Sequence, residues 1–331
     1  MHASATLASH LTAPARGAQP ICAAQPGWFK RDEAIMGTAI AVELWASDAR
    51  RARAAIDAVM AEMHRIDHTM SPHRPQSELS CINRDAAHQP VRLSDEMFGL
   101  IARAIEFSAL SGGAFDISYA SAGQLYDYRR AMQPSADALA RACQAIGWRG
   151  LHLDPQARTL AFAHAGMRID LGGFAKGHAV DNATALLRRH GIGHACVSAG
   201  GDSRVLGDRR GRPWTLGIRH PRQATGVVAL LPLIDTAVST SGDYERYFER
   251  DGVRHHHIID PSNGRSPNAI HSVTILAADG LTAEALSKSL FVLGVEAGMA
   301  LIESQPGVDA IVVDAQGRLH YSTGMQAPQR A

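Results

Sequence analysis

Residues 169–181 constrain the fold more than any other segment of this chain of 331 residues. A short apolar stretch, predicted as a strand, leads through Gly172 and Gly173 to Lys176, and a helix is predicted over residues 181–190. Glycines let the backbone approach a ligand, and the first N–H groups of a helix have no partner inside it. A lysine in such a loop can meet phosphate as a point charge. The segment therefore indicates either an anion site or simply a tight turn between two elements.

A second glycine turn follows the next apolar run, where Gly200 and Gly201 precede Asp202. One such turn is common in proteins that alternate helices and strands. Two such turns, each beside a charged residue, favour a binding site for an anion the size of a nucleotide. Two ordinary turns between elements remain the alternative at this point.

The composition excludes several classes of protein. Apolar residues make up 46% of the chain, and acidic and basic residues are mixed along its length to a net charge of +1. Because there is no basic block and only 5% of the residues are aromatic, we expect no nucleic-acid partner. Cys22, Cys81, Cys143 and Cys196 are too far apart in sequence for a zinc knuckle or a disulfide scaffold. No apolar run reaches about 18 residues, so no membrane-spanning segment is expected.

The first 27 residues differ from the rest of the chain. They are rich in Ala, Pro, Gln and His, and they lack both a positively charged start and a sustained apolar core. This makes them a poor secretory signal. We interpret residues 1–27 as a disordered lead-in or the remnant of a targeting segment, and residues 28–331 as one domain, because no linker or repeat divides them.

Hydrophobic spacing gives the order of the elements. Helices are predicted over residues 49–70, 94–111, 135–146, 181–190, 282–293 and 296–304. Strands are predicted over residues 39–45, 151–153, 159–162, 195–198, 215–218, 226–231, 237–243, 273–277 and 310–313. This order predicts an α/β (α+β) fold: a single compact unit with a mixed or antiparallel sheet flanked by helices.

The candidate catalytic residues lie in the polar loops that follow the predicted strands. Three consecutive histidines occupy positions 255–257, but neighbours in an extended segment face opposite sides and cannot all bind one metal ion. His257, with Asp260 nearby, is the better candidate for a general base; an exposed histidine cluster is the alternative. Asp243 follows a Ser-Gly pair and could be only a loop cap. A Gly-x-Ser-x-Gly motif does not occur, which disfavours a serine hydrolase.

Eight short motifs, in order along the chain, resemble the ApbE family of flavin transferases. They are Met-Gly-Thr at 36–38, Met-Ser with Ser-Glu-Leu at 70–79, Gly-Ala-Phe-Asp at 113–116, the loop at 170–181, Ala-Gly-Gly-Asp at 199–202, Ser-Thr-Ser-Gly-Asp-Tyr at 239–244, His-Ile-Ile-Asp-Pro with a glycine at 257–264, and Ala-Glu-Ala-Leu-Ser-Lys-Ser-Leu-Phe-Val-Leu-Gly at 283–294. The resemblance covers nearly the whole chain and implies an ApbE-like, T-fold-like unit.

The resemblance also implies an activity. Such enzymes bind FAD and transfer its FMN half to a threonine or serine hydroxyl of a target flavoprotein, releasing AMP. The acceptor would be an FMN-carrying domain, typically of a membrane redox complex, and the location periplasmic, with the cytoplasm as the alternative because the N-terminus is a poor signal. Two other functions remain open: an FAD pyrophosphatase that gives AMP and FMN, and an FAD-binding protein without turnover.

Residue roles follow from the same resemblance. His257 would take the proton from the incoming hydroxyl, Asp260 would orient it, and Lys176 would lie against the diphosphate. The implied flavin- and nucleotide-binding residues are Met70, His73, Asp116, Gly172, Gly173, Lys176, Asp181, Gly200, Gly201, Asp202, Ser241, Gly242 and Asp243. Relatives often carry an aromatic residue where this chain has His73. Met70 either covers the flavin ring or only completes the apolar stripe of the first helix.

A magnesium ion bridging the phosphates is implied as well. Its ligands would be the Glu284 carboxylate, the Ala175 backbone oxygen and, at the position where relatives often have threonine, Lys288. This last residue departs from the pattern, because a charged lysine has no lone pair for a metal. Glu284 and Lys288 share one helix face, so the alternative is an ordinary Glu–Lys pair worth about 0.3–0.5 kcal/mol.

Overall fold

The computed structural model describes residues 25–223 and 225–325. Residues 1–24 of the predicted lead-in lie outside the described part, and the first strand already begins at Gly27. The main sheet has eight strands in the order β1-β2-β6-β7-β10-β13-β14-β15, and every neighbouring pair is antiparallel. Its strands are β1 (Gly27–Ile35), β2 (Thr38–Ala46), β6 (Ala195–Ala199), β7 (Asp202–Leu206), β10 (Ala237–Gly242), β13 (Ile270–Ala277), β14 (Asp309–Asp314) and β15 (Leu319–Tyr321). The predicted class is confirmed, with the sheet antiparallel.

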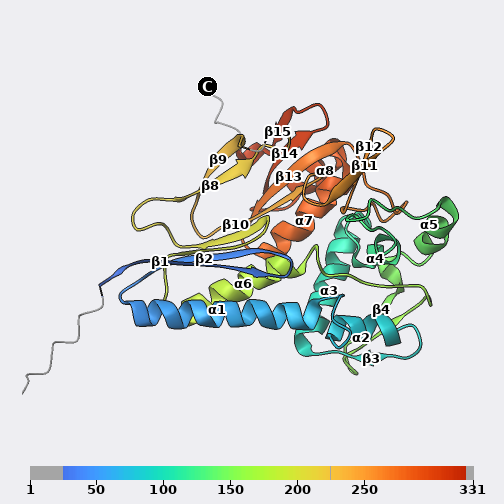
Figure 1. Ribbon diagram of the computed structural model, residues 1–331, viewed down its shortest axis with the longest axis horizontal. Helices are drawn as coiled ribbons and strands as arrows, with labels where there is room; N and C mark the ends of the chain where they lie inside the picture. The colour runs from blue at the N-terminus through green and yellow to red at the C-terminus, as the bar shows by residue number, and fades with distance from the viewer. Residues whose placement is uncertain (1–24, 224, 326–331) are drawn as a thin grey trace, which may run out of the picture.

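One face of this sheet carries a layer of helices (Figure 1). Helix α1 (Ala49–Met70) contacts β1 and β2, α6 (Ala175–Arg189) contacts β6 and β7, α7 (Gly280–Leu293) contacts β10 and β13, and α8 (Val295–Glu303) contacts β14. Each of these helices also contacts the next one in the layer. The bounds predicted for α1 are confirmed, because its N-cap Asp48 accepts the Arg51 N–H at 2.8 Å and its apolar stripe is buried.

The opposite face carries a two-stranded hairpin, β8 (Trp214–Arg219) with β9 (Val227–Leu233). Trp214, Ile218, Leu231 and Leu233 of the hairpin pack on apolar side chains of the sheet, among them Val238 of β10. A separate and larger apolar core lies between the sheet and the helices. The sheet is therefore buried on both faces, and its central strands connect two cores.

A mainly helical region gathers at one end of the molecule (Figure 1). Its elements are α2 (Glu78–Asp85), α3 (Asp95–Leu110), α4 (Ala120–Gly123), α5 (Ala136–Cys143), the short helices η1 (Ile117–Tyr119) and η2 (Trp148–Gly150), and a small sheet of β3 (Val91–Arg92), β5 (Thr159–Phe162) and β4 (Leu151–Asp154). The hairpin β11 (Tyr247–Arg250) and β12 (Val253–His256) and the terminal η3 (Thr323–Met325) complete the described part. The predicted third helix is shorter than residues 135–146.

Two predictions at the glycine loop are wrong. The apolar stretch before Gly172 forms no strand, because its backbone bonds elsewhere: the Asn83 amide pairs with both the N–H and the C=O of Ile169, at 2.8 Å each. Helix α6 also starts at Ala175 rather than at residue 181, so Lys176 lies in its first turn and not in the loop. Gly177, in that turn, serves a contact between helices that is described below.

Candidate active site

Helices α6 and α7 cross where two glycines meet. A Cβ on Gly177 would collide with the Gly280 carbonyl oxygen and lie 2.9 Å from the Leu281 nitrogen, and a Cβ on Gly280 would lie 2.6 Å from the Gly177 oxygen. Asp181, one turn along α6, accepts the Gly280 N–H at 2.8 Å and the Leu281 N–H at 3.1 Å, and also pairs with Arg204. Asp181 therefore holds the start of α7 against α6, rather than lining a cavity as predicted.

The close crossing brings four charged side chains together. Lys176 Nζ lies 2.7 Å from Asp202 Oδ2 and also contacts Glu284 Oε1, while Lys288 Nζ lies 3.3 Å from the same Oε1. We call Lys176, Asp202, Glu284 and Lys288 the lysine–carboxylate cluster. Glu284 is fully buried and Asp202 is 2% exposed, so neither carboxylate is solvated by bulk water. The segments that follow the two glycine turns, with Lys176 and Asp202, therefore lie together, and α7 contributes Glu284 and Lys288 to the same place.

Electrostatics hold Lys176 and Asp202 of the cluster in their charged forms, whereas burial lowers the pKa of Lys288. Burial opposes the charge on Lys176, but the Asp202 and Glu284 carboxylates outweigh it and raise the pKa of this lysine above its ordinary value. Burial likewise opposes the charge on Asp202, yet Lys176 and Lys288 lower the pKa of that carboxyl. Buried charges of this kind are stable only when paired and hydrogen-bonded.

Glycines let these side chains reach their positions. Gly200 has a φ of +63°, which favours glycine, and a Cβ there would lie 2.7 Å from Thr38 Oγ1. A Cβ on Gly201 would lie 2.5 Å from the Thr240 oxygen. The tight turn between β6 and β7 therefore places Asp202 at the start of β7. Lys288 lies across the first glycine loop, with its Cε 3.5 Å from where a Gly173 Cβ would be, and the neighbouring Gly172 N–H donates to Asp170.

A chain of hydroxyl groups supports the cluster from β10. Ser239 donates to Asp202 Oδ1 at 2.5 Å and lies 3.2 Å from Ser287 Oγ, which is 2.8 Å from Ser241 Oγ. Ser287 itself donates to the Glu284 backbone oxygen. Ser239 had no predicted role of its own, and the Ser287 hydroxyl was considered only as a substitute metal ligand. Alternation along β10 could have revealed the first, since residues 239 and 241 share a strand face.

His257, just after β12, faces the same region. Burial lowers its pKa to about 3, and the charges of His256, Lys288, Arg246 and Lys176 lower it further. Its Nδ1 is buried and has no hydrogen-bond partner within the described residues. The imidazole is therefore neutral at physiological pH, lies within electrostatic reach of both lysines, and can accept a proton.

Asp260 does not orient His257 in this structure. Its carboxylate accepts the Ser262 N–H at 2.9 Å and the Asn263 amide at 2.6 Å, and so stabilises its own turn. Both oxygens are used locally, which leaves the His257 ring without the predicted partner. From the sequence alone, an aspartate that stabilises a turn cannot be distinguished from one that orients a catalytic base.

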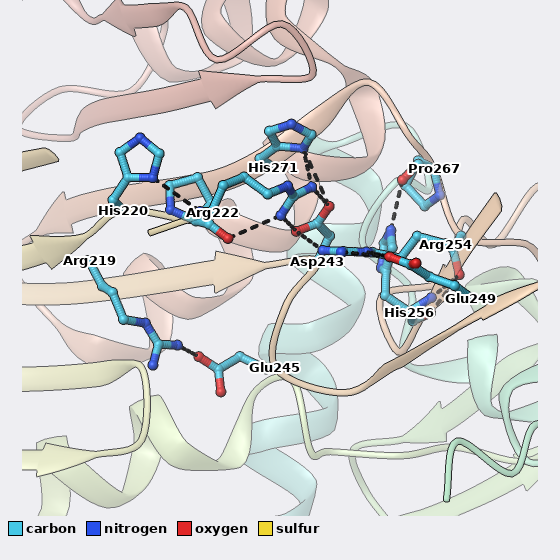
Figure 2. A network of polar contacts seen from close by, with 12 residues as sticks. Arg219, His220, Arg222, Asp243, Glu245, Glu249, Arg254, His256, Pro267 and His271 are labelled. Atoms are coloured by element: carbon cyan, nitrogen blue, oxygen red, sulfur yellow. Dashed lines mark hydrogen bonds and ion pairs between the residues drawn. The ribbon is translucent and has the colours of Figure 1, made fainter. Parts of the chain in front are cut away.

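Asp243, at the end of β10, is the centre of a separate charge network (Figure 2). Its carboxylate accepts both Arg222 Nη atoms, at 2.8 and 2.5 Å, and lies within 3.5 Å of Arg254 and 3.4 Å of His271. Asp243 is only 5% exposed. Beside it, a Cβ on Gly242 would collide with the Tyr244 ring. Both residues brace the end of β10, where it carries Ser241 into the site.

Three further predicted residues stay apart from the cluster. Asp116 accepts the Ser118 N–H and hydroxyl and the Trp148 N–H, so its carboxylate is used in the helical region, where burial raises its pKa. Met70 is 4% exposed and belongs to the main core, which favours the apolar-stripe alternative. His73 is exposed in the turn after α1.

The predicted magnesium ligands do not fit a metal ion. The described residues contain no group of three His, Cys, Asp or Glu side chains that could hold one. Two ammonium groups lie on Glu284 Oε1, and its Oε2 accepts the Gly177 N–H at 2.7 Å. Ala175 lies in the first turn of α6, so its carbonyl belongs to that helix. Mg²⁺ requires several oxygen ligands, and here cations occupy the one carboxylate expected to supply them.

Comparisons with known proteins place this arrangement in a family. The model of the ApbE family matches residues 36–312. The FAD:protein FMN transferase of Treponema pallidum is 35% identical, with 90% of this chain and 87% of the relative covered, and that of Vibrio cholerae is 33% identical, with 85% of each covered. A crystal structure of the ApbE protein from Thermotoga maritima has a TM-score of 0.85 at 32% identity, covering 92% of this chain and all of the other. The flavin transferase ApbE from Vibrio cholerae has a TM-score of 0.80 at 27% identity, covering 90% and 98%. The chain belongs to the ApbE family.

Proposed function

We propose that this chain is an FAD:protein FMN transferase, which moves the FMN half of FAD to a threonine or serine hydroxyl of an acceptor flavoprotein and releases AMP. The observation that carries the proposal is the position of a neutral, buried imidazole, His257, within electrostatic reach of two lysines, Lys176 of α6 and Lys288 of α7. The curated relatives named for this activity cover most of the chain, which supports FAD as the donor.

The reaction is a phosphoryl-type transfer. The acceptor hydroxyl oxygen attacks the phosphorus that carries the riboflavin half of FAD. The bond from this phosphorus to the bridging oxygen breaks, and that oxygen leaves with AMP. The hydroxyl proton passes to a nitrogen of His257, which its lowered pKa keeps neutral before the reaction. In such transfers, positioning and charge stabilisation contribute more than covalent catalysis.

Lys176 and Lys288 supply the charge. The FAD diphosphate is anionic, and each ammonium group has three donors to offer phosphate oxygens. Both side chains are partly exposed, at 23% and 18%, whereas the carboxylates that hold them are buried. A ligand can therefore reach the lysines without meeting the carboxylates.

One assay separates the proposal from its two alternatives. Purified chain is incubated with FAD and an acceptor domain that carries the target threonine. A fluorescent flavin that stays on the acceptor in a denaturing gel, together with AMP, supports transfer. AMP with free FMN indicates an FAD pyrophosphatase, and intact FAD bound to the chain indicates a carrier; either result contradicts the proposal.

A pair of variants tests the proposed base. His257→Ala is expected to lower transfer at least about 100-fold while FAD binding changes little, because it removes the proton acceptor and no ligand of the diphosphate. His255→Ala is the matched control, since the His255 ring stacks on Phe248. Equal activity of both variants would remove His257 from this role.

We also propose that the acceptor belongs to a membrane redox complex and that the chain acts in the periplasm. The resemblance to the family is what supports both. None of the helices within the described residues is long and apolar enough to cross a bilayer. Fractionation of the native cells and N-terminal sequencing test the location, and recovery from the cytoplasm with an uncleaved N-terminus would contradict it.

A further inference from the structure

We infer that the Lys288 ammonium replaces the divalent cation expected in this family, so that this chain transfers FMN without bound magnesium. The inference rests on the proposed function, and it concerns how the diphosphate charge is neutralised. It comes from the lysine–carboxylate cluster, in which Lys288 contacts the one carboxylate that resemblance assigns to a metal.

Every carboxylate oxygen of the cluster already has a donor. Glu284 Oε1 accepts from Lys176 and Lys288, and Oε2 accepts the Gly177 N–H at 2.7 Å. Asp202 Oδ1 accepts the Ser239 hydroxyl at 2.5 Å, and Oδ2 accepts Lys176 at 2.7 Å. A divalent ion would have to share these buried oxygens with donors already in place, among them the two ammonium groups on Glu284 Oε1. Repulsion between these ammonium groups and a divalent cation opposes its binding.

The remaining hydroxyl groups are committed as well. Ser287 donates to the Glu284 backbone oxygen and lies 2.8 Å from Ser241 Oγ. Ser289, on the other side of Lys288, donates to the Ala285 backbone oxygen at 2.9 Å. Neither serine can take the place of the threonine hydroxyl that relatives often have. The cluster thus has no uncommitted hydroxyl group to hold Mg²⁺ beside the Glu284 carboxylate.

The charges of the cluster balance without a metal. Two lysines face two carboxylates, so the charges cancel when all four groups are ionised. With threonine at position 288, one lysine would face two buried carboxylates, and the excess negative charge would attract a cation. The Lys288 ammonium group, which is part of the chain itself, supplies the positive charge that a bound cation would otherwise provide. Its side chain lies across Gly173, where no Cβ separates it from a ligand in the glycine loop.

Three proteins test the inference: the wild type, Lys288→Thr and Lys288→Met. Each is stripped with EDTA, and FMN transfer to an acceptor domain is measured in EDTA and in millimolar Mg²⁺. The wild type is expected to change less than about twofold between the two conditions. Lys288→Thr is expected to lose about 100-fold in EDTA and to recover with Mg²⁺, and Lys288→Met to be impaired in both, since it has neither charge nor oxygen.

Manganese binding to the same proteins without FAD gives a readout independent of activity. Electron paramagnetic resonance should show free Mn²⁺ with the wild type and bound Mn²⁺ with Lys288→Thr. Wild-type transfer that requires Mg²⁺, or tight Mn²⁺ binding by the wild type, overturns the inference and leaves the proposed function intact. Wild-type protein that transfers no FMN in either condition counts against the proposed function, while Mn²⁺ binding still decides the inference.

Discussion

Substitution of Gly177 by alanine tests whether the crossing of α6 and α7 builds the site. The added Cβ would collide with the Gly280 carbonyl and lie 2.9 Å from the Leu281 nitrogen. These atoms are backbone of the second helix, so a side-chain rotation cannot relieve the collision. Helix α7 has to move as a unit, and Glu284 moves with it, away from the Gly177 N–H that it accepts at 2.7 Å.

The magnitude follows from opposing effects. Overpacking at such a contact costs about 1–3 kcal/mol, and a buried hydrogen bond to a charged group contributes about 1.5–3 kcal/mol. Alanine regains about 1 kcal/mol over glycine through helix propensity. We expect Gly177→Ala to lower the free energy of unfolding by about 3 kcal/mol. FAD affinity should fall too, because Lys176 loses part of its carboxylate support.

Urea unfolding and titration of FAD fluorescence measure the two effects. Gly99→Ala is the matched control, since Gly99 is an exposed residue of α3 with nothing within 4 Å of an added Cβ. It should gain up to about 1 kcal/mol by the same propensity change. If Gly177→Ala unfolds at or above the wild-type urea midpoint and binds FAD normally, the close crossing does not position the site.

Three further results are expected. Asp243→Asn should cost about 3–5 kcal/mol of stability in urea unfolding, because Arg222 loses the buried carboxylate that it faces in Figure 2, whereas Glu245→Gln at an exposed ion pair should change it by less than about 1 kcal/mol; equal losses would refute this difference. The lowered pKa of His257, about 3, predicts that kcat/KM for FAD stays level from about pH 8 to about pH 5, and an inflection near 6.5 would contradict it. Hydrogen bonding to Arg65 lowers the pKa of Glu96 to about 2, so its stabilisation is present above 4.5 and is lost as the pH falls toward 2. The stability difference between the wild type and Glu96→Gln should therefore shrink as the pH falls below about 4.5, and a constant difference would argue against the ion pair.

Local patterns predicted the elements that are stabilised locally. The first helix has its predicted bounds because an aspartate caps its start and a regular apolar stripe runs along it. The start of α6 was mispredicted because Gly177 reads as a helix breaker in isolation. Only its distant contact with Gly280 shows why the helix accepts it. Interactions between residues far apart in sequence are invisible to periodicity.

The candidate site shows the same division. The motifs singled out Lys176, Asp202 and Glu284, which meet in the structure as an ion-paired group, and Lys288 was recognised as a departure from the family. Carboxylates were harder to assign. Asp260, for example, could be read as a catalytic partner, but its oxygens serve the N–H and amide groups of the turn that follows it. Residue type indicates what a carboxylate can do, whereas the backbone around it decides what it does.

Strand β10 places neighbouring residues in opposite chemical environments. Val238 packs into the apolar contact with the β8–β9 hairpin, while the Ser239 hydroxyl donates to Asp202 on the helical side. A shift of the strand pairing by one residue would exchange the positions of Val238 and Ser239. It would place a hydroxyl in the apolar core and a methyl group against a carboxylate. A mispaired β10 would thus lose stability and activity in the same event. Partly active but fully folded molecules should not arise from errors at this strand, and activity should report directly the fraction of chains that have folded correctly.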